Sequence, residues 1–476
     1  MKLKKKKMKI KFKSSLICKN KIVNSKYFIP KLTNENYSNL ITNTFFDIKK
    51  YTFNIQHNNL FNSNIKNTND DYIKNEVLIP QWFYKKDNPL LRARQYELIT
   101  TEYQKDIILK WIEMSRIIYN ITVYYFRKHK LISFMKVRKI IKNSLSNQIK
   151  RLLKLYNTPE HIIDNSINDV IKAYTSILAN KKAGNITKFL VRYKKHTKDN
   201  QTIVIEKEDF SKNKNGFYVK YLSENKKFIE FKTNPEIKLT KSTILHNIRL
   251  TYMKLKDKFI LHIPTEVTKK DNITNNKCFI DPGNKTFLTI YNPKGECYKL
   301  YNRDENKRLF KLIDKRYILK KILEEKYNKN NIKRNPILIK KFNKCYKQIS
   351  YKIKNLIKEL HNKSADFLCK NFDKILLGKL STKGVTSKNN NMSSKEKRYT
   401  YALSHDKFRT VLQNEVEKYN YKELKIVDES YTTRTCGLCG VINNTVGNNR
   451  LFNCKYCITE IDRDLNSARL IGIKNE

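Results

Sequence analysis

The chain has 476 residues, of which 99 are Lys or Arg and 44 are Asp or Glu, so its formal net charge is +55. Its apolar fraction of 39% supports packed cores, the few Gly and Pro exclude collagen-like and low-complexity chains, and no apolar run reaches the length of a membrane-spanning helix. So large a positive charge opposes compaction unless a polyanion neutralises it, which predicts a nucleic-acid partner and no membrane partner.

Residues 1–75 form a segment rich in Lys, Asn, Ser and Ile. The first 25 residues carry ten lysines and no acid, and no apolar core of a secretory signal follows them. We expect a basic, disordered extension. The same composition would serve as a nuclear-localisation signal or a nucleic-acid-binding arm. We therefore expect an intracellular protein, placed in the nucleus if the host is eukaryotic.

The second region is predicted to be a small β-domain with a helical insertion. Arg92–Leu98 has a strand pattern, and Thr101 with Gln104 forms a capping-box pattern for a helix that reaches Phe126. Helical periodicity continues over 130–156 and 159–181. Five short strands are then expected, at 201–205, 217–221, 228–231, 248–255 and 258–263.

The third region is predicted to contain a mixed sheet. Strands are expected at 278–281, 286–291 and 296–300, followed by two long basic helices at 303–330 and 335–371. A short strand at 374–377, a loop at 381–396, a helix at 397–419 and a strand at 424–427 complete the pattern. Three antiparallel strands followed by strands that alternate with helices are typical of a ribonuclease H-like sheet.

Four of the nine cysteines are clustered near the C-terminus. Cys436, Cys439, Cys454 and Cys457 have the spacing C-x2-C-x14-C-x2-C, which predicts a structural zinc site closed by four thiolates, with a redox dithiol as the alternative. Gly440 lies where such a knuckle needs a positive φ. The remaining cysteines are interpreted as small hydrophobic residues; they are Cys18, Cys278, Cys297, Cys345 and Cys369.

Acidic residues occur at two further informative places. Asp281 ends a predicted strand directly before Pro-Gly, where an Asp commonly starts a turn. Asp462 and Asp464 follow the cysteine cluster at the start of a predicted helix, where an Asp commonly caps the first turn. Each acid alone has this ordinary structural interpretation. Together with the cysteine cluster, the acids form a combination that indicates a functional site.

In that combination, over roughly 78–473, the chain resembles the TnpB proteins of insertion sequences and, more closely, their eukaryotic and viral relatives called Fanzor. The residues that carry the resemblance are Arg92-Ala-Arg-Gln-Tyr96, Tyr119-Asn120, Ile280-Asp281-Pro-Gly283, His361-Asn-Lys-Ser364, Tyr431-Thr-Thr433, the four cysteines and Asp462-Arg-Asp464-Leu-Asn466-Ser-Ala468. The resemblance implies an RNA-guided DNA endonuclease with a RuvC-type site, in which three acids hold two Mg²⁺ ions. It implies Asp281 as the first acid and Asp464 as the last, with Asp462 as a less favoured substitute.

The middle acid departs from the TnpB pattern. TnpB proteins carry a Glu where this chain has Gly378, followed by Lys379. Either the site is inactive, or another acid reaches it, as in Fanzor proteins. We favour Glu429, which follows the strand at 424–427 and precedes Tyr-Thr, because Gly378 leaves room for a side chain from a neighbouring strand. Asp428 is less favoured, and Glu415 and Glu417 are runners-up.

The resemblance also implies the domain organisation and the partners. The expected segments are the extension at 1–75, a β (wedge) domain at 76–104 and 201–272 around a helical recognition domain at 105–200, a RuvC-like nuclease domain at 273–430 and 460–476, and a zinc ribbon at 431–459. The expected partners are a guide RNA and double-stranded target DNA, bound by a monomer. The alternatives are a catalytically inactive RNA-guided DNA-binding protein and an unguided zinc-ribbon DNA-binding protein.

Overall fold

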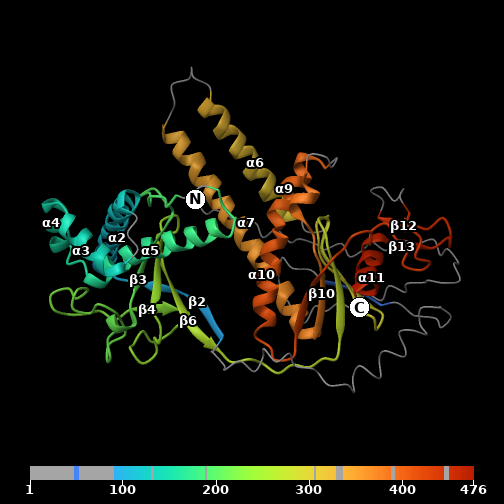
Figure 1. Cartoon of the computed structure of the whole chain (residues 1–476), viewed down its shortest axis with the longest axis horizontal. Helices are drawn as coiled ribbons and strands as arrows, with labels where there is room; N and C mark the ends of the chain where they lie inside the picture. Colours follow the sequence, from blue (N-terminus) through green and yellow to red (C-terminus); the bar gives the residue numbers. More distant parts are fainter. Residues whose placement is uncertain are drawn as a thin grey trace, which may run out of the picture.

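The structure is a computed structural model that describes residues 48–52, 90–129, 133–187, 190–304, 307–328, 336–387, 392–443 and 450–475. Cys18 and most of the predicted N-terminal extension lie outside these residues. The chain has an α+β fold built on a five-stranded and a six-stranded sheet, with a small two-stranded sheet near the C-terminus (Figure 1). No helix within the described ranges is long and apolar enough to cross a membrane.

The five-stranded sheet has the order β3-β5-β6-β2-β4 and is antiparallel throughout. Its strands are β2 (Leu90–Ile99), β3 (Asn200–Ile205), β4 (Lys232–Asn234), β5 (Ile248–Met253) and β6 (Lys258–Val267). Between β2 and β3 the chain forms the helices α2 (Glu102–His129), α3 (Phe134–Ser144), α4 (Asn147–Leu155) and α5 (Glu160–Lys182). The predicted helical insertion in a β-unit is therefore observed.

The start of α2 follows the predicted capping box. The backbone N–H of Thr101 donates to Oε1 of Gln104 at 3.0 Å, and the backbone N–H of Gln104 donates to Oγ1 of Thr101 at 3.2 Å. Two amide donors that the helix itself leaves unpaired are thus satisfied. Further along α2, the Asn120 side chain donates to the Lys194 carbonyl at 3.0 Å and accepts from its N–H at 2.8 Å. This residue of the Tyr119-Asn120 motif therefore holds the segment that leads into β3.

The six-stranded sheet has the order β1-β9-β8-β7-β10-β11. Its strands are β1 (Ile48–Thr52), β7 (Lys277–Pro282), β8 (Thr286–Tyr291), β9 (Glu296–Asn302), β10 (Lys374–Gly378) and β11 (Glu423–Val427). The pairs β7–β8 and β8–β9 are antiparallel, whereas β7–β10 and β10–β11 are parallel. The predicted sequence of antiparallel strands and then strands alternating with helices is confirmed.

Helices cover both faces of the six-stranded sheet. The helices are α6 (Lys307–Asn328), α7 (Pro336–Asn371), α8 (Thr382–Val385), α9 (Ser394–Leu403), α10 (His405–Val416) and α11 (Arg463–Asn475). Helices α7 and α10 lie on one side and α11 on the other, while α6 and the start of α7 project as a hairpin (Figure 1). Under α11 lies a small core of Phe279, Leu376, Val427 and Ile471.

Three sequence predictions of secondary structure differ from the structure. The strands expected at 217–221 and 228–231 are turns and isolated bridges, because their aromatic residues pack into the core as a loop: the rings of Phe217 and Phe231 lie 4.8 Å apart. The loop expected at 381–396 contains α8 and the start of α9. The single helix expected at 397–419 is divided at Ser404, whose φ of 52° a helix does not allow.

The ends of two predicted domains also differ. Residues 48–52 of the expected disordered extension form β1, which pairs antiparallel with β9 and so covers backbone groups that a bare sheet edge would expose. Residues Glu460–Asp462 form β13, which pairs with β12 (Leu451–Asn453) instead of joining the large sheet. The cysteine-rich unit therefore extends to Asp462, and the last helical segment begins at Arg463.

Candidate functional site

Three strands end at one edge of the six-stranded sheet. The parallel register places Ile280 of β7 beside Leu377 of β10, and Gly378 of β10 beside Val427 of β11. Since parallel strands present their carboxyl ends at the same edge, Asp281 and the residues after Val427 lie at that edge. This edge therefore brings together two of the chain segments that carry sequence-predicted acids.

Glu429 reaches the space beside Gly378. A Cβ atom added to Gly378 would lie 2.8 Å from Oε2 of Glu429, 3.1 Å from Cδ1 of Ile471 and 3.2 Å from Cδ of Pro282. A larger residue at position 378 would thus collide with the carboxylate of Glu429, which follows the neighbouring strand β11. Glu429 and Pro282, which directly follows Asp281, thus both approach Gly378, as expected if Gly378 leaves room for the Glu429 side chain.

The hydrogen bonds at the start of α11 distinguish Asp464 from Asp462. Oδ1 of Asp462 accepts hydrogen bonds from the backbone N–H groups of Asp464 and Leu465, each at 3.1 Å, and Oδ2 of Asp462 contacts Nζ of Lys299 at 2.6 Å. Asp462 is therefore the N-cap of α11, with both carboxylate oxygens engaged. The Asp464 side chain takes no part in this cap; its Oδ1 lies 3.4 Å from the Arg463 guanidinium.

The alternative acids are engaged with other partners. Asp428 is exposed and pairs with Lys474 at 2.6 Å, and the pKa of its carboxyl is lowered to about 2, chiefly by the hydrogen bond from Lys474. Glu415 pairs with Lys418 at 2.5 Å, one turn along the end of α10. Glu417 pairs with Arg92 of β2 and so joins the two large sheet units.

The three acids affect one another electrostatically. Burial raises the pKa of Asp281 well above its ordinary value, and the carboxylates of Asp464 and Glu429 add to the shift. Burial also raises the pKa of Glu429 to about 7, with a further contribution from Asp428, whereas Arg409 opposes the shift. Burial is the main cause of both shifts, because it disfavours the charged form of a carboxyl, and nearby negative charge adds to it.

This arrangement fits a divalent cation. Oε2 of Glu429 is buried without a hydrogen-bond partner among the described residues. An orphaned carboxylate oxygen beside two further acids is a donor set of the hard-oxygen type that Mg²⁺ prefers. Only the cysteines bring three or more donor atoms within 4.8 Å of one another in the described part of the chain, so the acids are spaced more widely than the ligands of one ion.

The position of Asp281 is also fixed by a buried aromatic stack. The ring of Phe287 lies between His361 and His405, with centroid distances of 5.6 and 5.0 Å. Nε2 of His405 is 3.1 Å from the carbonyl oxygen of Gly283, in the turn that follows Asp281. Burial lowers the pKa of both histidines to about 4, so they are neutral near pH 7. The His361 motif residue packs against Phe287 and bonds to the carbonyl of Leu403, two residues before His405.

The four clustered cysteines form a compact site. All four sulfur atoms lie within 4.8 Å of one another, with Sγ of Cys436 at 3.6 Å from that of Cys457 and Sγ of Cys439 at 3.5 Å from that of Cys454. Tetrahedral zinc with Zn–S bonds of about 2.3 Å requires sulfur separations of about 3.8 Å. Gly440 has the predicted positive φ, 74°. The cluster could therefore bind one zinc ion.

Replacing Cys436 or Cys454 by Ser should remove about one equivalent of zinc and destabilise the C-terminal unit, because structural zinc contributes directly to folding. Elemental analysis and thermal unfolding of the purified variants would measure both effects. Cys345→Ser, in a partly buried position outside the cluster, is the matched control and should keep its zinc. Zinc-free wild-type protein with unchanged stability in a chelator would contradict the assignment.

The sequence did not reveal how the cysteine unit is attached to the acid-bearing helix. Asn466 lies two residues after Asp464, and its Oδ1 accepts from the backbone N–H of Gly437 at 2.9 Å. Nδ2 of Asn466 donates to the carbonyl of Thr435 at 2.8 Å. The Asn466 side chain is fully buried, and a Cβ atom at Gly437 would lie 2.4 Å from its Oδ1. Asn466 therefore links the first cysteine knuckle to α11.

Two hydroxyl groups complete this link. Oγ1 of Thr432, in the Tyr431-Thr-Thr433 motif, donates to the Glu429 carbonyl at 2.9 Å and lies 2.9 Å from Oγ of Ser467. Ser467 also hydrogen-bonds to Asp281, which lowers the pKa of that carboxyl against the larger effect of burial. Ser467 lies three residues after Asp464 on α11, so a helical periodicity from Asp464 was the signal that would have found it.

Asn466→Ala should weaken zinc retention although Asn466 is not a zinc ligand. The substitution leaves the buried N–H of Gly437 and the carbonyl of Thr435 without their partner, at a cost of about 1–3 kcal/mol for each group. Zinc release to a colorimetric chelator should be faster than in wild type. Asn475→Ala, near the exposed end of the same helix, is the control. An unchanged release rate would show that the link is dispensable.

Comparison with known proteins agrees with the resemblance seen in the motifs. A TnpB-like protein of Acanthamoeba polyphaga mimivirus is 28% identical over 412 residues, which cover 81% of this chain and 74% of that protein. A second TnpB-like protein of the same virus is also 28% identical over 412 residues, covering 81% of this chain and 73% of that protein. The predicted similarity to TnpB proteins is confirmed, and the viral origin of both relatives is consistent with the predicted viral branch.

Two further matches concern domains and structures. The family described as Cas12f1-like, TNB domain matches residues 405–471, from α10 to α11. Among solved structures, the chain is similar to Cas12f1 in a cryo-EM complex with sgRNA and target DNA, with a TM-score of 0.45 and 17% identity, covering 78% of this chain and 83% of that chain. The family match spans the Glu429 turn, the cysteine cluster and Asp464.

Proposed function

We propose that the protein is a member of the TnpB and Fanzor group that cleaves target DNA under the direction of a guide RNA, as the nuclease of a mobile element. The observation that carries the proposal is the approach of Glu429 to Gly378. Glu429 brings a carboxylate to the sheet edge at which Asp281 lies. The TnpB pattern has its Glu at the position of Gly378, on the neighbouring strand β10. Asp464, from the first turn of α11, is the third acid of the proposed site.

The reaction proposed is hydrolysis of a phosphodiester bond. Asp281, Glu429 and Asp464 would hold two Mg²⁺ ions, whose chemistry when bound is to activate water and to stabilise the leaving oxygen. The Asp462 cap fixes the start of α11 and thereby the direction of Asp464. Arg463 and Arg409 are cations close enough to affect the acids, and they would face the negative phosphate at this edge.

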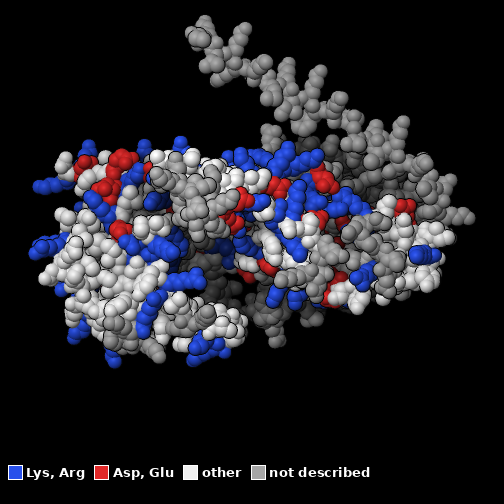
Figure 2. Space-filling model, turned by 90° about the horizontal axis from the view of Figure 1, so that it is seen from above, with Lys and Arg blue, Asp and Glu red and all other residues white. Residues whose placement is uncertain are grey.

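The proposed RNA guide accounts for the charge of the chain. The formal charge of +55 is the excess of Lys and Arg over all Asp and Glu, so ion pairs within the chain cannot neutralise it. Figure 2 shows more Lys and Arg than Asp and Glu on the face seen from above. A guide and its heteroduplex present phosphates in A-form geometry, which proteins recognise through the backbone. In this proposal the segments 76–104 and 201–272, with the helical insertion 105–200, bind RNA, and 273–430 with 463–476 forms the nuclease.

The experiment that tests the proposal is sequencing of the RNA that copurifies with the protein, followed by a cleavage assay. A defined RNA and Mg²⁺-dependent cutting of a DNA target matched to it are expected. Nonspecific RNA and no cutting would refute the proposal. A defined RNA with specific DNA binding but no cutting would favour the second candidate, an RNA-guided DNA-binding protein; the observation that favours this candidate is Gly378 at the position of the family's Glu.

A further inference from the structure

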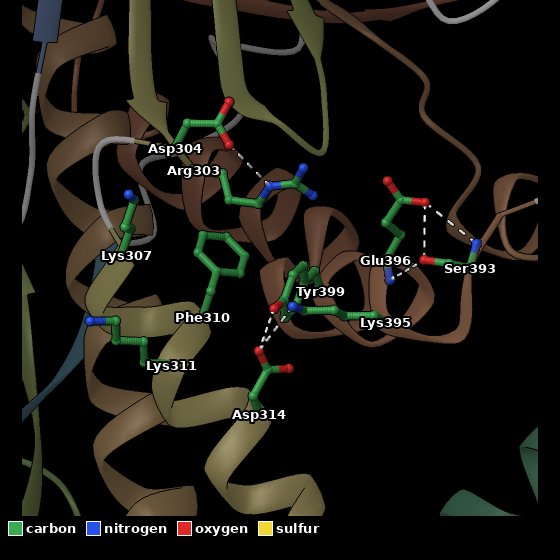
Figure 3. A pocket seen from close by; sticks show the side chains of 10 residues that line it. All are labelled: Arg303, Asp304, Lys307, Phe310, Lys311, Asp314, Ser393, Lys395, Glu396 and Tyr399. Carbon is green, nitrogen blue, oxygen red and sulfur yellow. Dashed lines mark hydrogen bonds and ion pairs between the residues drawn. The ribbon is translucent and has the colours of Figure 1, made fainter.

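A concave, mostly basic site lies between two helices that flank the six-stranded sheet. It is a pocket of about 590 Å³ between the start of α6 and the start of α9, and Figure 3 shows its lining side chains. Arg303, Lys307, Lys311 and Lys395 contribute positive charge, and Phe310 and Tyr399 form the floor between them. None of these residues belongs to the proposed catalytic site.

Both walls of the pocket are attached to the turn that follows Asp281. Strands β7 and β9 are both antiparallel to β8, so β9 ends at the same sheet edge as β7. Arg303 directly follows β9, and its backbone N–H donates to the carbonyl of Lys285 at 2.7 Å. On the other wall, α9 leads through Ser404 to His405, which contacts Gly283 in the same turn. The pocket therefore lies at the same edge of the sheet as the turn that follows Asp281.

The acids in the lining already have partners. Asp304 lies 3.8 Å from Arg303 and 2.8 Å from Arg450. Asp314 accepts from the Tyr399 hydroxyl at 2.6 Å and lies 3.6 Å from Lys395.

The third acid of the lining is also engaged, and two cations are left over. Glu396 closes a capping box with Ser393 at the start of α9. Lys307 and Lys311 are exposed, one helical turn apart on α6, and neither has an ion pair among the described residues. The net charge available to a ligand at this pocket is positive.

The floor of the pocket is buried and closely packed. The rings of Phe310 and Tyr399 lie 4.6 Å apart and are only 5% and 6% exposed, and the Tyr399 hydroxyl is held by Asp314. A buried floor with exposed lysines at the rim suits a ligand that is held by its charge while its apolar parts rest against the edges of the rings. The volume lies within the range of about 300–1,000 Å³ that is typical of sites for small ligands, and is far too small for a double helix.

We propose that this pocket binds the phosphate backbone of single-stranded DNA on its way to the acid edge, with Lys307 and Lys311 as the phosphate ligands. The inference rests on the proposed function for the identity of the strand. DNA is favoured over the guide RNA because the cut strand must pass the edge where Asp281 lies. Phosphate contacts by lysine position a strand without reading its sequence, so no base preference is expected.

The test compares two double variants that lose the same charge. Lys307→Gln with Lys311→Gln removes the pocket's free cations. Arg308→Gln with Lys315→Gln removes two exposed cations of α6 that do not line the pocket. Both are made in the full chain with its copurified RNA and in an Asp464→Asn background, so that no DNA is cut. The affinity for fluorescent oligothymidylate is then measured over a series of salt concentrations.

The pocket variant should bind oligothymidylate more weakly, and the slope of log affinity against log salt should fall by about 1.4, since each single-strand phosphate contact contributes about 0.7. The control should keep the wild-type slope. Equal losses in both variants, an unchanged slope, or a loss confined to RNA binding would overturn the proposal. Unchanged thermal unfolding excludes misfolding. Because no cutting is required, a failure of the proposed nuclease activity would be seen separately.

Discussion

Glu429→Gln is expected to abolish DNA cleavage while guide RNA and target binding stay close to wild type. The substitution keeps the shape of the side chain beside Gly378 and removes one ligand charge from the proposed site. The loss should exceed about 100-fold, since even residues that only support a metal ligand change metal affinity or activity by about 10- to 100-fold. Single-turnover cleavage with matched guide, target and Mg²⁺ measures the effect.

Three substitutions serve as controls for this result. Glu415→Gln and Glu417→Gln should cut nearly as wild type, because their partners are Lys418 and Arg92, away from the acid edge. Asp428→Asn should also cut, because that carboxylate is exposed and paired with Lys474. If Glu429→Gln cut at the wild-type rate, Glu429 would not be the middle acid.

A second-site change tests whether side chains at positions 378 and 429 can reach the same metal ion. Gly378→Glu in the Glu429→Gln background should restore part of the activity if both side chains reach one metal. The added Cβ would lie 2.8 Å from the end of the side chain at position 429, 3.1 Å from Ile471 and 3.2 Å from Pro282, so the side chain at 429 must move aside and the other two must shift slightly. Gly378→Gln in the same background adds the same bulk without charge. Equal activity of the two double variants would argue against a shared position.

The pH dependence of stability offers a readout that does not require cleavage. The pKa of Glu429 is about 7 in the folded chain against an ordinary value of 4.5, so the folded state binds the proton more tightly. Without Mg²⁺, this group's contribution to stability is present below about pH 4.5 and is lost as the pH rises through about 7. Glu429→Gln should therefore raise the thermal midpoint of Mg²⁺-free protein at pH 8. A lower midpoint would contradict the burial of an unpaired carboxylate.

Gly472→Ala is expected to produce the second large effect, a loss of stability in the acid-bearing helix. A Cβ atom at Gly472 would lie 2.1 Å from two ring carbons of Phe279, a buried residue of β7. Helix α11 would have to move away from the sheet, and overpacking of this kind typically costs about 1–3 kcal/mol. Thermal unfolding of RNA-bound protein measures the loss, and cleavage should fall with it because α11 carries Asp464.

The matched control for Gly472→Ala is Ile473→Ala, the next position on the same helix. The Ile473 side chain is 45% exposed, so its truncation should change stability far less. Alanine favours a helix over glycine by about 1 kcal/mol, so a stabilised Gly472→Ala variant would mean that the helix can shift without cost. That outcome would show that the site does not require the close approach of α11 to β7 at Gly472 and Phe279.

Much of the organisation followed from the sequence because it depends on local patterns. Period-2 and period-3.6 alternation predicted most strands and helices, and the Thr101–Gln104 pair formed the predicted capping box. The cysteine spacing predicted the compact four-sulfur cluster, because two short knuckles need only local geometry. Loops that pack aromatic residues, such as the segment around Phe217, were mistaken for strands because their apolar density resembles that of a strand.

The tertiary structure alone decided which acids share one edge and which do not. Sequence motifs left Asp462 and Asp464 as alternatives, and the hydrogen bonds of the α11 cap separate them. The approach of Glu429 to Gly378 depends on β10 and β11 being parallel neighbours, which are far apart along the chain. The links from Asn466 to the cysteine knuckle and from Gly472 to Phe279 are likewise long-range. Such contacts arise from packing between elements, and no local pattern of residues encodes them.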